Sequence, residues 1–158
     1  MKKVLITGGN GDIAKSILKL LQEQNQKFVV ISPDRFELDV TIYDKSRAYI
    51  EKHCPDILIN NAGYIKVNSL VDDDFLSDKK TIDVNLTSIF NLSIAAVKYN
   101  PQVQVINIGS SAATKPRGSW SSYCATKAAL VMATKCWADE GINTICLSPG
   151  RTVSTMRE

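Results

Sequence analysis

The residues VLITGGNGDIA at positions 4–14 decide which fold the chain can adopt. They join a short apolar run to a glycine-rich turn, and the turn opens a segment in which apolar residues recur at helical spacing from Ile13 to Leu21. A buried strand, a tight turn and an amphipathic helix in this order are typical of the first unit of a parallel α/β sheet. We therefore predict a strand, a turn and a helix over this stretch.

The glycines of this turn follow the spacing of a phosphate-binding loop. Gly9, Gly11 and Ala14 match G-x-G-x-x-G/A, whereas Gly8, Gly11 and Ala14 match the alternative G-x-x-G-x-x-A. In both cases the missing side chains would let the backbone approach a pyrophosphate, and the helix N-terminal amides would point at it. A tight turn without a ligand is the alternative, because a lone glycine motif is a weak signal. The candidate phosphate-binding residues are Gly8, Gly9, Asn10, Gly11, Asp12 and Ile13.

The rest of the chain alternates short apolar runs with helical patterns. The predicted strands lie at 28–31, 56–60, 103–108 and 144–147, and the predicted helices lie at 43–53, 78–99 and 122–139. Only residues 33–37 separate the second strand from Leu38-Asp39-Val40, which is too few for a crossover helix, so a third strand there would be short. We predict one domain over 1–158 with an α/β fold: a three-layer, doubly wound, Rossmann-like parallel sheet of about six strands.

The composition excludes several classes of protein. With 44% hydrophobic and 22% charged residues among 158, the chain is typical of globular proteins, and we expect neither disorder nor a membrane span. The formal net charge of +3 is small and the basic residues are scattered, which argues against nucleic-acid binding. The first apolar run is too short for a secretion signal, so a cytoplasmic location is the default. The four cysteines form no C-x-x-C pair and His53 is the only histidine, so we predict no metal site.

A second chemical signal is the pair Tyr123 and Lys127 within the predicted helix 122–139. Residues four apart share one helix face, so the phenol and the ammonium would be neighbours. A free phenol has a pKa near ~10, and a nearby cation stabilises its anion, which makes the pair a proton donor of adjustable strength. Taken alone, the two residues are better explained as a packing aromatic and a solvated lysine.

Five motifs in a fixed order give this pair its significance. Each follows a predicted strand or lies on the next helix, and parallel sheets bind ligands at that edge. The motifs are Asn60-Asn61-Ala62-Gly63, Asn85, Ser111, the pair Tyr123 and Lys127, and Pro149-Gly150. In this order they resemble the short-chain dehydrogenase/reductase family, and the resemblance covers essentially the whole chain.

The resemblance implies an NAD(P)-dependent oxidoreductase that moves hydride between a nicotinamide and a carbonyl or secondary alcohol. It implies a catalytic tetrad of Asn85, Ser111, Tyr123 and Lys127. Tyr123 would be the acid/base, and Lys127 would stabilise its anion and hold the nicotinamide ribose. Ser111 would orient the substrate oxygen, and Asn85 would hold a water behind Lys127. Ser110 stays open as an alternative to Ser111.

The same resemblance implies further cofactor-binding residues. Asn61, Ala62 and Gly63 would run beside the adenine ribose, Asp39 and Val40 would meet the adenine, and Pro149, Gly150 and Thr152 would face the nicotinamide. An acid near the end of the second strand would bind the ribose hydroxyls of NAD, whereas an arginine would accept the extra phosphate of NADP. The sequence offers both, Asp34 and Arg35. We expect NADP, held by Arg35, because Asp34 falls beyond the expected strand end.

The chain differs from the family in the region that should cover the substrate. Family members usually continue past the Pro-Gly segment with a helical region and a final strand, and residues 151–158 resemble only the start of that region. We expect a compact or C-terminally shortened member with an open substrate site. The helices containing Asn85 and Tyr123 resemble those by which the family pairs, so we also expect a homodimer. Two other functions stay open: a cofactor-binding protein without turnover, favoured by Asp12 and the missing cover, and a sugar-nucleotide epimerase or dehydratase.

Overall fold

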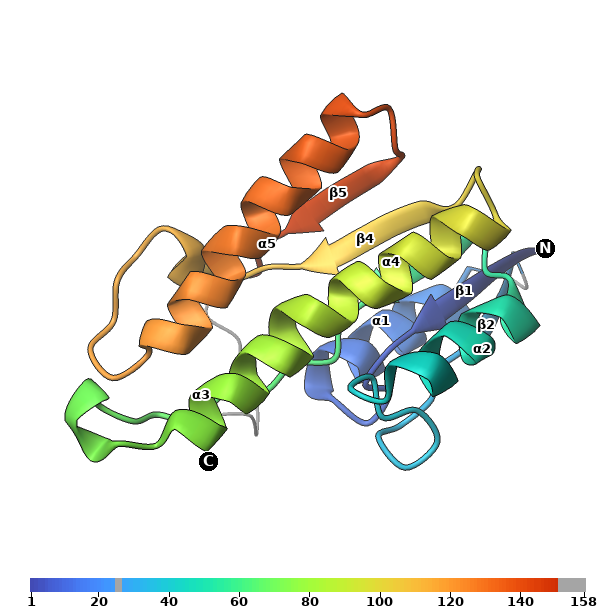
Figure 1. Ribbon diagram of the computed structural model, residues 1–158. Helices are drawn as coiled ribbons and strands as arrows, with labels where there is room; N and C mark the ends of the chain where they lie inside the picture. Colours follow the sequence, from blue (N-terminus) through green and yellow to red (C-terminus); the bar gives the residue numbers. More distant parts are fainter. Residues whose placement is uncertain (25–26, 151–158) are drawn as a thin grey trace.

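The strands of the chain form a parallel sheet in the computed structural model, which describes residues 1–24 and 27–150 (Figure 1). The order of the strands is β2-β1-β3-β4-β5, so the sheet grows in one direction from β1 to β2 and in the other from β1 to β3. The strands are β1 (Lys2–Ile6), β2 (Phe28–Ile31), β3 (Ile57–Asn60), β4 (Gln104–Ile108) and β5 (Thr144–Leu147).

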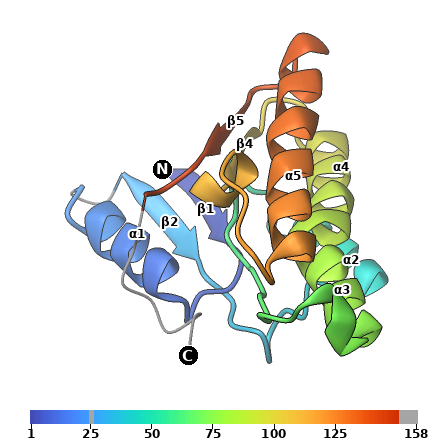
Figure 2. The same cartoon turned by 90° about the vertical axis from the view of Figure 1, so that its left-hand side faces the viewer.

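Helices cover both faces of this sheet. One face carries α1, and the opposite face carries α2, α4 and α5, as Figure 2 shows. The α-helices are α1 (Asp12–Gln22), α2 (Tyr43–His53), α3 (Phe75–Ile82), α4 (Ser88–Tyr99) and α5 (Ser121–Asp139), and the short helical segments are η1 (Leu70–Asp72), η2 (Asp83–Thr87) and η3 (Ser111–Ala113). This three-layer arrangement is the Rossmann-like α/β fold that the sequence predicts.

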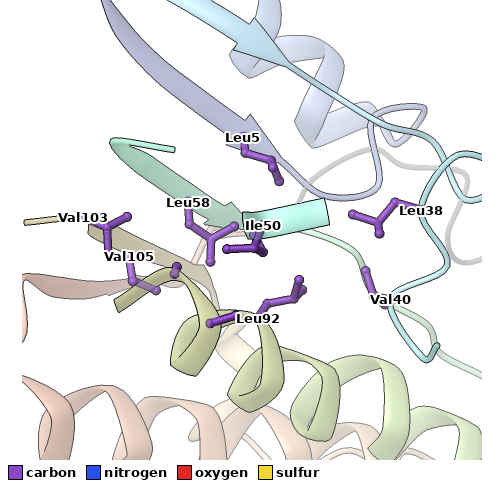
Figure 3. Packing of buried hydrophobic residues seen from close by; sticks show 10 residues of the cluster. Leu5, Leu38, Val40, Ile50, Leu58, Leu92, Val103 and Val105 are labelled. Carbon is purple, nitrogen blue, oxygen red and sulfur yellow. The ribbon is translucent and has the colours of Figure 1, made fainter. Parts of the chain in front are cut away.

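Alternate residues of β1 supply two apolar cores. Leu5 packs with Ile50 of α2 and Leu92 of α4 on one face (Figure 3), whereas Ile6 packs with Ala14 of α1 on the other. Successive strand side chains point to opposite faces, and a central strand of a parallel sheet is buried on both. This double burial fixes the position of the glycine turn that follows β1.

The strand predicted at 38–40 is absent. The Asp34 carboxylate accepts a hydrogen bond from the N–H of Phe36 at 2.8 Å, and the N–H of Leu38 donates to the Asp34 carbonyl at 2.9 Å. This closed turn leaves no extended length that could pair with β2. The described residues therefore form five strands and not about six. Leu38 and Val40 are nevertheless buried in the core of Leu5, which explains their apolar spacing.

The helix predicted at 78–99 is divided in two. It begins earlier, as α3, and a π-helical segment, η2, separates α3 from α4. Segments of this kind are frequent at functional sites, since one extra residue per turn redirects the side chains around it. Asn85 lies in this segment and is fully buried.

Candidate active site

A cavity of about 820 Å³ opens at the edge of the sheet where β1, β3, β4 and β5 end. Its volume is within the range of cofactor sites, and the strand order reverses at this edge between β1 and β3, where open α/β sheets bind ligands. The predicted site residues that line it are Gly8, Asn10, Gly11, Asp12, Ile13, Arg35, Asp39, Val40, Asn61, Ala62, Gly63, Ser111, Tyr123, Lys127, Pro149 and Gly150. The structure thus brings segments from the whole length of the chain to one place.

Two predicted site residues, Gly9 and Asn85, do not line this cavity, and Thr152 lies outside the described residues.

Among residues 1–24 and 27–150, no group of three or more His, Cys, Asp or Glu side chains is placed to hold a metal ion. Within the same ranges, no helix is long and apolar enough to cross a membrane.

The turn after β1 presents bare backbone to the cavity. Gly8 has a φ of +71°, a left-handed conformation that glycine adopts without steric cost, and a Cβ there would lie 3.0 Å from the Cα of Ala62. Gly11 is the N-cap of α1, and no side chain caps the helix. Gly11 and Ile13 both line the cavity, so the positive end of the helix dipole lies at its wall. This wall is suited to an anion such as a pyrophosphate.

Gly9 holds the turn close to the segment that follows β2, and its role in cofactor binding stays a prediction. Its N–H donates to the carbonyl of Pro33 at 2.9 Å, and a Cβ at this position would lie 2.3 Å from the carbonyl oxygen of Ser32. Only glycine fits this contact, which ties the turn to the end of β2. The spacing pattern could not separate the two uses, since close approach to a ligand and close approach to a strand both require glycine.

Thr7 is a site-building residue that the sequence reasoning missed. Its Oγ1 accepts hydrogen bonds from the N–H groups of Asn61 at 3.1 Å and Ala62 at 3.0 Å. In return the Asn61 side-chain amide donates to the carbonyls of Thr7 at 3.0 Å and Gly8 at 3.3 Å. These bonds join the segments that follow β1 and β3 into one wall of the cavity. A threonine at the end of a buried strand was the available signal.

Asn85 holds another wall in place. Its side-chain Oδ1 accepts from the N–H of Tyr64 at 2.8 Å, and its Nδ2 donates to the carbonyl of Tyr64 at 2.8 Å. The amide therefore satisfies both backbone groups of one residue in the cavity-lining segment 61–65. The water that Asn85 is predicted to hold behind Lys127 stays a prediction.

Tyr123 and Lys127 lie one turn apart near the start of α5, and both line the cavity. The Lys127 Nζ lies 5.6 Å from the centroid of the Tyr123 ring and donates to the carbonyl of Ile108 at 2.8 Å. Lys127 is only 5% exposed, and this burial lowers its pKa to about 8, although Cys146 on β5 opposes part of the change. Among the described residues Lys127 has no carboxylate partner. A buried cation without a counter-ion costs stability, and such groups cluster at functional sites.

Ser110 and Ser111 both reach the cavity. The Ser110 hydroxyl oxygen accepts from the N–H of Ala112 at 3.1 Å, which fixes the oxygen and leaves its proton able to point elsewhere. The carbonyl of Ser111 accepts from Lys115 at 3.1 Å, while its hydroxyl has no hydrogen-bond partner within the described residues. Of the two hydroxyls, that of Ser110 is held by a hydrogen bond, and the preference of the sequence for Ser111 stays a prediction.

Arg35 and Asp39 both line the cavity. Arg35 is largely exposed, and its Nε lies 3.8 Å from the Asp39 carboxylate. The Thr41 hydroxyl donates to Asp39 at 2.6 Å, and this bond is the main cause of the lowered pKa of Asp39. Asp34 does not line the cavity, because its carboxylate caps the turn and accepts from the Asn10 side chain at 3.2 Å.

Trp120, Tyr64 and Lys80 also line the cavity, and Trp120 belongs to the loop 115–120 that the sequence predicts beside the substrate space. Trp120 stands edge-on to Tyr123 with the ring centroids 5.7 Å apart, and the Arg117 guanidinium stacks over the Trp120 ring at 4.9 Å. Lys80 lies over the Tyr64 ring at 4.2 Å. Tyr64 and Lys80 belong to no spaced motif, so no signal in the sequence pointed to these two residues.

The model of the family described as short chain dehydrogenase matches residues 36–158. The chain therefore belongs to the short-chain dehydrogenase/reductase family, as its motifs predict. A 2,3-dihydro-2,3-dihydroxybenzoate dehydrogenase of Bacillus subtilis (strain 168) is 29% identical over 190 residues, which cover 99% of this chain and 72% of that protein. A 3-oxoacyl-acyl-carrier-protein reductase of Rickettsia conorii (strain ATCC VR-613 / Malish 7) is 31% identical, and the match covers 99% of this chain and 75% of the reductase.

The fold agrees with these sequence matches. A solved 4-hydroxyisoleucine dehydrogenase complexed with NADH superposes with a TM-score of 0.85 at 28% identity, covering 98% of this chain and 78% of that one. The family and the parallel α/β fold are thereby confirmed. By family, the chain is an oxidoreductase of the dehydrogenase and reductase type.

Proposed function

We propose that the protein is an NAD(P)-dependent oxidoreductase that transfers hydride between a nicotinamide and a carbonyl or secondary alcohol, with Tyr123 as acid/base. One observation carries the proposal: Tyr123 and the buried Lys127 line the same cavity as the uncapped glycine turn. The names of the relatives, dehydrogenases and reductases, support the reaction class, and the relative solved with NADH supports the cofactor class.

The cavity walls suit a nicotinamide dinucleotide. Gly8 and residues 10–13 would border the pyrophosphate, residues 39–40 and 61–63 would hold the adenosine, and residues 149–150 with Lys127 would hold the nicotinamide half. When bound, the cofactor would supply or accept the hydride. A helix end without a side-chain cap, and a buried ammonium with no carboxylate partner among the described residues, are the observations that fit an anionic, hydroxyl-rich ligand.

The chain itself would move the proton. The Tyr123 hydroxyl would donate to the carbonyl oxygen of the substrate and, in the reverse direction, remove the proton of the alcohol. The Lys127 ammonium would favour the phenolate, and each pKa unit of such stabilisation is worth about 1.4 kcal/mol. A cation buried in a low-dielectric wall acts more strongly than one in water.

Titration of NADPH and NADH followed by fluorescence, and then a screen of carbonyl substrates, tests the proposed function. The proposal requires cofactor binding and turnover of at least one carbonyl. Cofactor binding without turnover of any carbonyl would favour the alternative, a binding protein used in sensing or assembly.

We propose that the cofactor is NADP and that Arg35 recognises its extra phosphate, since Arg35 lines the cavity and Asp34 does not. Arg35→Ala should weaken NADPH binding about tenfold and leave NADH binding within about twofold, because a hydrogen bond to a charged group contributes about 1.5–3 kcal/mol. Arg47→Ala is the matched control, because Arg47 bonds to Asn91 and lies outside the cavity lining. Equal affinity of the wild type for NADPH and NADH, or a preference for NADH, would contradict the assignment.

We propose that a hydroxyl of the Ser110–Ser111 pair orients the substrate oxygen. The sequence favours Ser111. The hydrogen bond that holds the Ser110 oxygen favours Ser110. Replacing the orienting serine by alanine should lower kcat about 10²-fold, as the loss of one preorganised donor does in other enzymes. Ser110→Ala and Ser111→Ala serve as controls for each other. If both variants lowered kcat only slightly and to the same extent, neither serine would orient the substrate.

We further propose that two copies pair through α4 and α5. Ile94 on α4 and Met132 on α5 are 54% and 60% exposed, and Phe90 meets Trp137 between these helices with the ring centroids 4.9 Å apart. An apolar surface of this kind marks an interaction site. Light scattering at high micromolar concentration should give twice the chain mass of 17.4 kDa, and a monomer would contradict the pairing.

A further inference from the structure

Helix α5 carries Tyr123 and Lys127, yet most of its fully buried side chains are polar. Its buried residues are Thr126, Lys127, Leu130 and Thr134, of which Leu130 alone is apolar. Apolar side chains can slide past one another by a small distance and stay in contact. A hydrogen bond, in contrast, is lost when the distance between donor and acceptor grows by about 1 Å. The position of α5 therefore depends on where its buried polar groups find partners.

The Thr134 hydroxyl is one of these groups, and it is the last member of a hydrogen-bond network that crosses the interior. The Thr134 hydroxyl accepts from the Asn107 side chain on β4 at 2.9 Å and donates to the carbonyl of Leu130 in its own helix at 2.8 Å. The Asn107 Oδ1 accepts from the Asn60 side chain on β3 at 2.8 Å, and Asn60 also donates to Ser93 on α4 at 3.2 Å. Ser93, Asn60, Asn107 and Thr134 are all at least 96% buried.

We propose that Asn107 and Thr134 are positioning residues, whose hydrogen bond sets the place of α5 along β4 and so the places of Lys127 and Tyr123 in the cavity. Asn107 precedes Ile108, and the Ile108 carbonyl binds the Lys127 ammonium at 2.8 Å. The same strand is thus tied to the same helix at two points seven residues apart in α5, one in the cavity and one away from it. The inference rests on the proposed function, because it assumes that Tyr123 and Lys127 carry the chemistry.

The groups around Lys127 make a shift of α5 measurable. Tyr123 faces Lys127 from its own helix, and Cys146 faces it from β5. Burial raises the pKa of the Cys146 thiol, and Lys127 and the Thr134 hydroxyl oppose part of this change. If α5 moved along the sheet, the ammonium would change its distance from the Ile108 carbonyl and from Cys146. The pH at which Lys127 titrates would then change as well.

Thr134→Val removes the hydroxyl at nearly constant volume, and it tests the proposal directly. We expect kcat to fall about tenfold, as small misplacements of catalytic groups do, and the alkaline limb of the pH profile to move. Thr134→Ser keeps the hydroxyl and should restore both within about twofold. Asn107→Leu removes the other partner and should match Thr134→Val. Combining the two should add little, because residues that share one interaction are not additive.

Thr126→Val is the matched control. Thr126 is the same residue type on the same helix, it is 2% exposed against 4% for Thr134, and its hydroxyl donates only to the carbonyl of Tyr123 in its own helix. This variant should keep kcat and the pH profile within about twofold of wild type. Equal losses in Thr126→Val and Thr134→Val, or an unchanged kcat and pH profile in Thr134→Val, would overturn the proposal.

A second readout separates failure of this proposal from failure of the proposed function. If the wild type binds NADPH but reduces no carbonyl, the proposed function fails. The placement of Lys127 can then still be read from NADPH affinity, which should fall about fivefold in Thr134→Val and Asn107→Leu but not in Thr134→Ser or Thr126→Val. An unchanged affinity in all four variants would overturn the positioning role.

Discussion

Tyr123→Phe should lower kcat for carbonyl reduction at least about 10³-fold, because the ring stays in place while the proton donor is lost. Phenylalanine keeps the edge contact with Trp120 and the volume of the side chain, so NADPH should bind within about twofold of wild type. Steady-state rates of NADPH oxidation and a fluorescence titration of NADPH measure the two quantities. A fall in kcat without a change in cofactor affinity would mark Tyr123 as a group that acts in the chemical step.

Tyr49→Phe provides the control for losing a phenol elsewhere. Tyr49 lies on α2, its ring packs against His53 with the centroids 4.4 Å apart, and it is not part of the cavity lining. Its kcat should match the wild type. If Tyr123→Phe kept more than about a tenth of the wild-type kcat, the acid/base role would be wrong.

Lys127→Met should abolish activity and at the same time make the protein without cofactor more stable. Burial lowers the pKa of Lys127 from 10.5 to about 8, and a difference of this size corresponds to roughly 3 kcal/mol of cost for the buried ammonium. The lost hydrogen bond to Ile108 offsets about 1 kcal/mol or more of the gain. The net expectation near neutral pH is a gain of about 1–2 kcal/mol, which is a rise in Tm of about 3 °C. Differential scanning calorimetry measures it.

The pH dependence of this gain has a definite sign. Below pH 8 Lys127 is protonated in both the folded and the unfolded chain, so the folded protein bears the full cost of burying the charge. Between about pH 8 and 10.5 the unfolded chain binds more protons than the folded one, and the stability contributed by this group rises with pH. The advantage of Lys127→Met should therefore shrink as pH rises through this window.

Lys135→Met is the control for removing a charge from the same helix, because Lys135 is exposed on α5. It should change Tm by less than about 1 °C, as surface substitutions do. A fall in Tm for Lys127→Met, or a gain that grows above pH 8, would contradict the account of a buried ammonium with no carboxylate partner in the part of the chain that the structure describes.

The edge of the sheet where the site lies could be predicted from the sequence because the motifs there are local. The glycine turn, Asn61 and the pair Tyr123 and Lys127 each follow a strand whose apolar run is continuous, and parallel strands end at a common edge. Helix spacing alone placed the phenol and the ammonium on one face of α5. These inferences need no knowledge of tertiary contacts.

The predictions that failed, or that were never made, depend on contacts between distant segments. Leu38 and Val40 alternate like a strand, but the Asp34 cap closes a turn in front of them. Gly9 matches the phosphate motif, and the motif does not reveal that its backbone also lies against Ser32. The role of Thr7 appears only when the end of β3 is placed beside it. Propensity and spacing carry no information on such pairs.

The most direct measurement of the central claim is the fate of deuterium carried at C4 of the nicotinamide ring of NADPH. The wild-type protein should deliver the label to the carbinol carbon of the alcohol product, and Tyr123→Phe should yield almost no labelled product over the same time. Proton donation by Tyr123 and hydride transfer from the cofactor complete one reduction, so both must be present for the label to appear. Reduced product without deuterium, or labelled product formed equally fast by Tyr123→Phe, would contradict the account.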